Sequence, residues 1–543
     1  MGIPSYFSYI IQTHNNVLYK YATIVQQRIF FQRLYMDCNS ILYDCYHNLS
    51  SNETVESMKK KLIEDTANKI ENYIRQIQPT ECVYIAFDGV APMAKMEQQR
   101  TRRYKSWFEA AFSESIDPKN ADPMKTTSMF TPGTEFMNDL SIYMRTRFYK
   151  KEKKLNVKQI IIATPDEPGE GEHKLYSHLR ENPCKHGERC VVYGLDADLL
   201  MLSLLHLSYC PNLYVFREAP QFAKLLQKKN EPVQPDEPWF LDMAKLGRSI
   251  SNEMRCRHSD NHRMYDYVFM CFLLGNDFLP HFPALNIRTN GITIILDVYR
   301  KVIANTPNRY LLSKTNPPKI VWKEFYTLMK ELAKNEYHYI CQEYSQRRKW
   351  DNKSPEIQPK KTVKEKSELL QNTPVLYRQE ENYICPHESK WESRYYKILF
   401  PENTQVNDVC KNYLEGLEWV FQYYMEGKVD WIWKYNYHYP PLLVDLATKV
   451  PILPTKFLPQ RMTSSVHPYT QLCYVLPPIH HHLLPKNIQS MLRKKYKHVY
   501  EIKVDEKNIP ILDFKWAFCR FFWESHVNLP DIQIRDEDIR LSQ

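Results

Sequence analysis

Short apolar runs recur along the first two hundred residues, and each run leads to a carboxylate. Four of them lie at residues 34–36, 83–87, 160–163 and 191–195. Continuous short apolar runs are typical of strands that are buried on both faces of a parallel sheet. The pattern therefore predicts four buried parallel strands.

Longer polar stretches with the composition of helices separate these strands. Residues 54–76 lie between the first and second strands, and residues 91–112 lie between the second and third. Strands that alternate with helices form an α/β domain, in which helices cover both faces of a mostly parallel sheet. We expect this fold class for the first part of the chain.

The carboxylates that follow the predicted strands form one set. Sites in open α/β sheets form beyond the carboxyl ends of the strands, so acids at several strand ends converge in one crevice. Two pairs are spaced i, i+2, which in extended backbone puts both side chains on one face. One more acid follows an apolar stretch at residues 267–274. The candidate catalytic and metal-ligating residues are Asp37, Asp88, Glu170, Glu172, Asp196, Asp198 and Asp277.

Seven carboxylates in one crevice would repel one another, and bound cations would relieve that repulsion. Ligand sets made of oxygen alone select hard ions, so we expect Mg²⁺, with Mn²⁺ as a substitute. Two ions about 3.5–4 Å apart would activate a water and stabilise the leaving oxygen of a phosphodiester. The acids therefore predict hydrolysis of phosphodiesters with two metal ions.

A cationic helix face follows the second strand. Pro92 and the helix formers after it predict the start of a helix. Lys95, Gln99, Arg102 and Arg103 are spaced i, i+4, i+7 and i+8, which places them on one face of that helix. Because arginine forms bidentate contacts with phosphate, this face is a candidate site for a terminal phosphate. A solvated charged surface is the alternative.

Composition narrows the class of protein. The chain has 543 residues, a net charge of +10 and 43% hydrophobic residues, which excludes a disordered chain. It has no GxxxxGK[ST] or GxGxxG loop, which argues against an NTP-driven motor. Its 13 cysteines lie singly, no signal peptide precedes them, and no apolar run approaches about 18 residues. We expect an intracellular protein with free thiols and no membrane partner.

The pattern changes beyond residue 310. Residues 346–372 carry lysines and arginines among Ser, Pro and Gln, which is typical of an exposed basic linker or insertion. An aromatic-rich part follows. We expect a first domain with the metal site over residues 1–345, the basic segment over 346–372, and a second region over 373–543 that packs on the first domain.

Several motifs resemble the XRN family of 5′→3′ exoribonucleases. They are the segments 87–92 (FDGVAP), 168–174 (PGEGEHK), 193–198 (YGLDAD) and 274–281 (LGNDFLPH). The second region is similar to the family at residues 416–420 (GLEWV) and 437–441 (YHYPP). The motifs follow the order of the family along nearly the whole chain, which makes chance agreement negligible.

The resemblance implies a nuclease domain of the flap-endonuclease or PIN-like type and a mainly helical second conserved region. It implies two divalent ions held by the seven acids, and a pocket for a 5′-phosphate at Lys95, Gln99, Arg102 and Arg103. The implied substrate is single-stranded RNA with a 5′-monophosphate, which is degraded processively to 5′-mononucleotides. A decapping enzyme would supply this RNA, and we expect a cytoplasmic monomer, with the nucleus left open.

Base stacking is where the chain departs from the family. The family has a stacking histidine in its first motif. In this chain the resemblance puts Tyr43 in the place of that histidine, and its flat ring can also stack. Stacking contributes about 1–3 kcal/mol per base and tolerates any base. The opposing platform is expected at Trp431 or Trp433, with Trp431 favoured, and a core position is the alternative for each.

Two rival functions stay open from the sequence. A structure-specific flap-type DNA nuclease would use the same sheet, although the aromatic second region has no counterpart in such enzymes. A catalytically silent RNA-binding scaffold would keep the fold, although this chain retains all seven acids.

Overall fold

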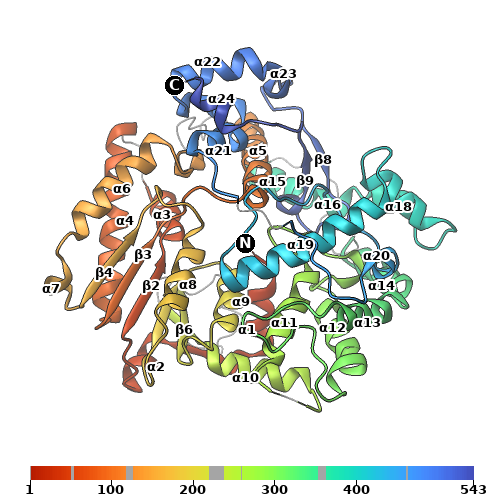
Figure 1. Ribbon diagram of the computed structural model, residues 1–543. Helices are drawn as coiled ribbons and strands as arrows, with labels where there is room; N and C mark the ends of the chain where they lie inside the picture. The colour runs from red at the N-terminus through yellow and green to blue at the C-terminus, as the bar shows by residue number, and fades with distance from the viewer. Residues whose placement is uncertain are drawn as a thin grey trace.

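A seven-stranded sheet organises the first part of the chain (Figure 1). The computed structural model describes residues 2–49, 54–117, 126–218, 238–258, 260–351, 362–459 and 463–542. The strands lie in the order β1 (Leu18–Lys20), β7 (Pro238–Asp242), β6 (Leu213–Glu218), β5 (Cys190–Tyr193), β2 (Arg33–Asp37), β3 (Cys82–Ala86) and β4 (Gln159–Ala163).

Strands β2 to β6 are parallel, and β7 and β1 add antiparallel pairs at one edge. The four predicted strands are confirmed as β2, β3, β4 and β5, but β4 lies at the edge of the sheet and its three isoleucines are only half-buried, so its predicted full burial is wrong. The expected α/β class with a mostly parallel sheet is confirmed with them. Strands β1, β6 and β7 were not foreseen from the sequence pattern.

Alternate residues of the central strands enter two different cores. In β2, Leu34 and Met36 belong to the apolar cluster on one face, and Tyr35 belongs to the cluster on the other. In β3, Val83 and Tyr84 divide in the same way. Because both faces of the sheet are buried, its strands consist of continuous apolar runs rather than alternating ones.

Helices cover both faces of the sheet, as expected. On one face, the core contains residues of α3 (Asn39–His47), α4 (Val55–Ile77) and α6 (Glu135–Phe148). On the other, it contains residues of α8 (Gly171–Glu181), α9 (Asp198–Leu205), α10 (Met243–Met254) and α11 (Arg263–Cys271). Three shorter helices are α1 (Tyr6–Thr13), α2 (Tyr21–Gln26) and α7 (Glu152–Leu155).

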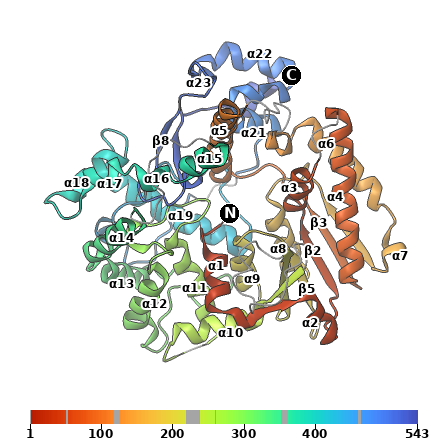
Figure 2. The same ribbon diagram turned by 180° about the vertical axis from the view of Figure 1, so that it is seen from behind.

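Helix α5 (Met93–Ile116) begins directly after Pro92, as predicted. It leaves the sheet and runs beside the later part of the chain, where it contacts β9 (His526–Asn528) and α15 (Val363–Gln371) (Figures 1 and 2). The hairpin partner of β9 is β8 (Asp513–Lys515). Helix α5 therefore links the sheet to the second region.

The second region is mainly helical, as expected. Its central helix, α19 (Val406–Glu426), belongs to the same apolar cluster as the sheet residue Tyr35, so one core spans both parts of the chain. The other helices after α11 are α12 (Gly291–Tyr299), α13 (Trp322–Ala333), α14 (Glu336–Asp351), α16 (Thr373–Leu376), α17 (Gln379–Ile384), α18 (Trp391–Leu399), α20 (Leu443–Lys449), α21 (Pro468–Val475), α22 (Lys486–Lys495), α23 (Lys497–Tyr500) and α24 (Asp536–Arg540). Among the described residues, no helix is both long and apolar enough to cross a bilayer.

The basic segment 346–372 is not exposed throughout. Arg348 and Lys349 are exposed, but Arg347 is buried at the end of α14, so its expected exposure is wrong. Its guanidinium donates to both carboxylate oxygens of Glu381, at 2.8 and 2.6 Å. A bidentate partner in the core explains how an arginine from a polar run becomes buried. Residues 352–361 lie outside the described residues.

Replacing Arg347 by Met should destabilise the protein by about 3 kcal/mol, because the buried Glu381 carboxylate would lose its bidentate partner and keep the more distant Arg378 at 3.5 Å. Thermal unfolding measures the loss. The double variant Arg347→Met/Glu381→Gln should recover most of the stability, since the amide oxygen can still accept from the backbone amide of Phe518. A single variant as stable as the wild type would show that this ion pair does not support the junction between α14 and α17.

Candidate active site

The sheet brings the predicted acids to its carboxyl edge. Asp37 is the last residue of β2, and Asp88 follows β3 by two positions. Asp196 and Asp198 follow β5, on the other side of β2. The strand order changes direction at β2, which lies between β3 and β5. The loops after these strands therefore run apart and leave a crevice, which is where ligands bind in such sheets.

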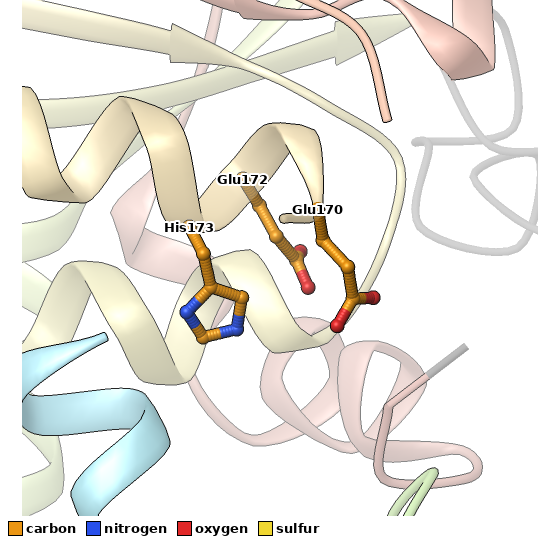
Figure 3. Close-up of side chains that lie close together, drawn as sticks. All are labelled: Glu170, Glu172 and His173. Carbon is orange, nitrogen blue, oxygen red and sulfur yellow. The ribbon is translucent and has the colours of Figure 1, made fainter. Parts of the chain in front are cut away.

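The start of α8 adds a compact group of side chains to this edge. Glu170 precedes the helix, and Glu172 and His173 lie in its first turn (Figure 3). One ligand atom from each of the three residues lies within 4.8 Å of the others, so together they could hold a metal ion. The backbone amide of Gly171 donates to Oδ1 of Asp88 at 2.7 Å, which ties the helix start to the end of β3.

Burial, together with repulsion, raises the pKa values of several acids at this edge, whereas Lys95 outweighs burial and lowers the pKa of Asp277. Burial and then Asp88 raise the pKa of Asp37 well above its usual value. Burial and then Asp198 do the same for Glu172, while burial and Asp277 raise the pKa of Asp198 to about 7. This mutual repulsion connects all seven predicted acids, Asp37, Asp88, Glu170, Glu172, Asp196, Asp198 and Asp277.

The donor set fits a hard divalent cation. Buried oxygens Oδ1 of Asp37 and Oδ1 of Asp198 have no hydrogen-bond partner among the described residues. A buried carboxylate without a donor is costly to keep charged, and a bound cation removes that cost. Oxygen ligands of this kind suit Mg²⁺ or Mn²⁺.

Lys95 lies inside the acid cluster. Its ammonium is 2.5 Å from Oε2 of Glu170 and 2.8 Å from Oδ2 of Asp277. Burial opposes the charge of this lysine, but Asp277 and then Glu170 outweigh burial and raise its pKa well above the usual value. Lys95 therefore joins the predicted cationic face directly to the acids.

The other residues of the cationic face lie further along α5. Arg103 is buried, and its Nη1 is 3.4 Å from the hydroxyl of Ser128, which also bonds Nδ1 of His480 at 2.8 Å. Burial lowers the pKa of Arg103 to about 10, and its Nε has no hydrogen-bond partner among the described residues. A buried guanidinium with a free donor has the properties of an anion site.

Arg102 and Gln99 lie beside that buried arginine. The guanidinium of Arg102 donates to the hydroxyl of Tyr43 at 3.0 Å, and its carbon lies 5.8 Å from the centre of the Tyr43 ring. The side-chain amide of Gln471 approaches Oε1 of Gln99 at 3.5 Å. Tyr43 is thus attached to the cationic face of α5.

The two candidate tryptophans occupy different environments. Trp433 is buried and stacks on Trp419, with ring centres 5.3 Å apart. Trp431 is half-buried, and its carbonyl accepts from the amide of Met93 at the start of α5, at 2.8 Å. Only Trp431 combines partial exposure with a place next to α5.

Two tyrosines of α19 complete the acid cluster, and the sequence reasoning did not assign them to it. The hydroxyl of Tyr423 donates to Oε1 of Glu170 at 2.6 Å, and its ring stacks on His173 at 3.5 Å. Tyr424 bonds Asp198. Both residues follow the GLEWV motif, so the adjacency of a buried Tyr pair to a family motif was the available signal.

Comparisons with known proteins cover nearly the whole chain. The family model described as the XRN 5′-3′ exonuclease N-terminus matches residues 1–219. The model described as the Xrn1 helical domain matches residues 258–386 and 376–536.

Curated relatives are similar over most of this chain. The 5′-3′ exoribonuclease 1 of Saccharomyces cerevisiae is 23% identical over 92% of this chain and 41% of its own length. The human 5′-3′ exoribonuclease 1 is 25% identical over 92% of this chain and 32% of its own length. The 5′-3′ exoribonuclease 2 of Kluyveromyces lactis is 31% identical over 69% of this chain and 44% of its own length. The chain thus spans less than half the length of these three relatives.

A solved structure of the catalytic core of Rad2 in complex with DNA substrate aligns with 82% of this chain and 92% of its own, at 14% identity and a TM-score of 0.34, which is too low to support an inference. The family assignment rests on the two family models. The helical-domain model alone matches more than half of the residues, and the N-terminal model covers the acids at the ends of β2 to β5. The chain belongs to the XRN family of 5′-3′ exonucleases.

Proposed function

We propose that this chain is a 5′→3′ exoribonuclease that hydrolyses single-stranded RNA with a 5′-monophosphate, processively and to 5′-mononucleotides. One observation carries the proposal: helix α5 carries both Lys95, which contacts the acids, and the buried Arg103 two turns further on, which we propose as an anion site. Eight residues of helix span about 12 Å. The names of the relatives, all 5′-3′ exoribonucleases, support the same activity.

The seven acids are the proposed ligands of two divalent cations, Mg²⁺ or Mn²⁺. When bound, such a pair supplies the charge that stabilises the attacking and leaving oxygens of a phosphodiester. The hydroxyl of Tyr423 fixes one oxygen of Glu170, and the amide of Gly171 fixes one oxygen of Asp88. These contacts hold the carboxylates in one orientation, which residues around a ligand set typically do.

The cationic face of α5 is the proposed site of the 5′-phosphate. Arg103, Arg102 and Gln99 would hold its oxygens, and Lys95 would contact the phosphate from the side of the acids. Because the helix is rigid, the distance between this site and the acids fixes which phosphodiester can be cut. A 5′-monophosphate arises when a cap is removed, so a decapping enzyme is the expected partner in the cytoplasm.

Tyr43 and Trp431 are the proposed stacking platforms for the leading bases. Tyr43 is held by Arg102, and Trp431 lies at the start of the same helix. Trp433 is the weaker candidate, because its buried ring already stacks on Trp419. Stacking on two fixed rings would hold the strand while the first nucleotide is removed.

A substrate comparison tests the proposed activity. With Mg²⁺, 5′-phosphorylated RNA should be degraded to mononucleotides faster than 5′-hydroxyl RNA by about 10- to 150-fold, the range for losing a hydrogen bond to a charged group. Product size is read by gel. Faster cutting of flap DNA into oligonucleotides would favour the flap-type nuclease, and unchanged decay by Asp196→Ala/Asp198→Ala would favour the silent scaffold.

The variant Arg103→Met should remove the preference for a 5′-phosphate. We expect its rate on 5′-phosphorylated RNA to fall by about 10- to 150-fold, because a charged donor to the phosphate is lost. Its rate on 5′-hydroxyl RNA should stay unchanged and serves as the internal control. Equal losses on both substrates would mean that Arg103 supports the fold and not the phosphate.

A pair of glycine variants tests the crowding at the acids. A Cβ at Gly171 would lie 2.9 Å from Oδ1 of Asp37, whereas a Cβ at Gly247 would lie 3.4 Å from a flexible Leu207 methyl. Gly171→Ala should therefore lower turnover by roughly 10²-fold through displaced carboxylates. Gly247→Ala, its matched control, should keep near wild-type turnover. Equal turnover by Gly171→Ala and Gly247→Ala would show that the start of α8 can accommodate the Cβ without displacing the acids.

A further inference from the structure

A large cavity lies along a second face of α5, next to the cationic face. Its volume is about 1180 Å³, above the range of about 300–1,000 Å³ that is usual for small-ligand pockets. Its wall follows α5 from Ala94 to Glu109, a distance of about 22 Å at 1.5 Å per residue. The opposite walls are the loop 275–281, the segment 435–439 and the β8–β9 hairpin.

This cavity joins the acid cluster to the outside. Asp277, which is bound to Lys95, lines its inner end, together with Gly2. Its other walls include Asn528 and Trp523 of the hairpin region, which are exposed. It is therefore a passage and not a closed void.

Arg102 borders both faces of α5. It belongs to the cationic face with Arg103, and it also lines the cavity. Lys105, one turn further, lines the cavity as well. Residues three apart are neighbours on the surface of a helix, so Arg102 and Lys105 lie side by side. These two residues form a cation track that leads from the cationic face into the cavity.

Two acids of the cavity wall, Glu97 and Glu524, are paired with cations, while Glu109 and Asp513 also line the wall. Glu97 is paired with Lys434 at 2.8 Å, and Glu524 is paired with Arg288. The ammonium of Lys105 donates to the carbonyls of Trp523 and Ser525, at 2.6 and 2.7 Å. It makes no ion pair within the described part of the chain. Burial lowers its pKa to about 8, and the nearby Glu109 and Glu524 act against that shift, so the ammonium stays mostly charged at pH 7.

Flat rings also line the passage. His438 and His526 stack with ring centres 5.1 Å apart and planes 16° apart, and Tyr437 and Phe400 form a second pair with ring centres 5.7 Å apart. Aromatic rings accept any nucleobase by stacking. The passage thus offers cations for a phosphate and rings for a base, and both are features of a mononucleotide path.

We propose that this passage is the exit of the nucleoside 5′-monophosphate product. The inference rests on the proposed function, since it assigns a path to the nucleotide that each cut releases. A product that leaves by the passage does not have to cross the RNA strand, which is held at Tyr43 and Trp431. The strand can then advance while the previous nucleotide departs, a condition for processive hydrolysis.

The test narrows the passage far from the acids and separates the first cut from later ones. Thr101 lines the passage, whereas Ala110 is exposed on the same helix outside it. With 5′-labelled, 5′-phosphorylated RNA in rapid quench, Thr101→Trp should leave the first cut unchanged. It should slow steady-state nucleotide release by roughly tenfold or more, since product release then limits turnover. Ala110→Trp should change neither rate.

Three results would overturn or redirect the inference. Equal loss of the first cut and of the steady state would mean that the passage holds substrate, and loss of neither would mean that product leaves elsewhere. If Thr101→Trp unfolds below the assay temperature, Leu529→Trp, which narrows the same passage from the hairpin side, is read in the same way. A wild-type enzyme that yields no mononucleotides would refute the proposed function itself.

A binding measurement with adenosine 5′-monophosphate gives a second readout. Lys105→Gln keeps a donor for the two carbonyls and removes the charge, so the affinity for this nucleotide should fall by about 10-fold or more. Ala110→Trp should bind it like the wild type. Equal affinity in Lys105→Gln and the wild type would remove Lys105 from the path and overturn the cation track.

Discussion

The repulsion among buried carboxylates is the constraint on which the rest of this structure depends. Seven acids crowded at one edge of a sheet repel one another strongly unless partners offset their charge. The chain supplies partners from three directions: the ammonium of Lys95 from α5, the amide of Gly171 from α8, and the hydroxyl of Tyr423 from α19. Helices α5, α8 and α19 therefore each provide a group that offsets the negative charge of the acids.

Helix α19 explains why the second region accompanies the sheet. Its two adjacent tyrosines contact Glu170 and Asp198, which lie at the starts of two different helices of the first region, α8 and α9. A sheet alone would leave these carboxylates to find their own orientation. The second region therefore orients two carboxylates of the proposed metal site.

The sequence predicted those parts that depend on local pattern. The four strands, the start of α5 and the convergence of the acids follow from short-range rules about burial and strand ends. Lys95 shows the limit of such rules. Helical spacing predicts that Lys95 shares a face with Arg103. Spacing does not reveal that Lys95 forms ion pairs with Glu170 and Asp277, which come from other elements.

Arg347 and Trp433 are two positions at which the local pattern does not reveal the environment. A basic run predicts exposure, yet one arginine of the run meets a carboxylate from α17 and enters the core. An aromatic motif predicts a platform, yet one of its two tryptophans fills the space above Gly416. Both outcomes depend on partners that lie far away along the chain, which no local window contains.

The apolar cluster that joins the sheet to α19 determines how the chain can be divided. Residues as distant as Tyr35 and Trp419 belong to one cluster, so the two regions do not have independent interiors. A cut between them would expose a large apolar surface on both pieces and would separate the acids from their tyrosines. The chain should therefore fold and unfold as one cooperative unit, and fragments that end at the boundary between the regions should be prone to aggregation.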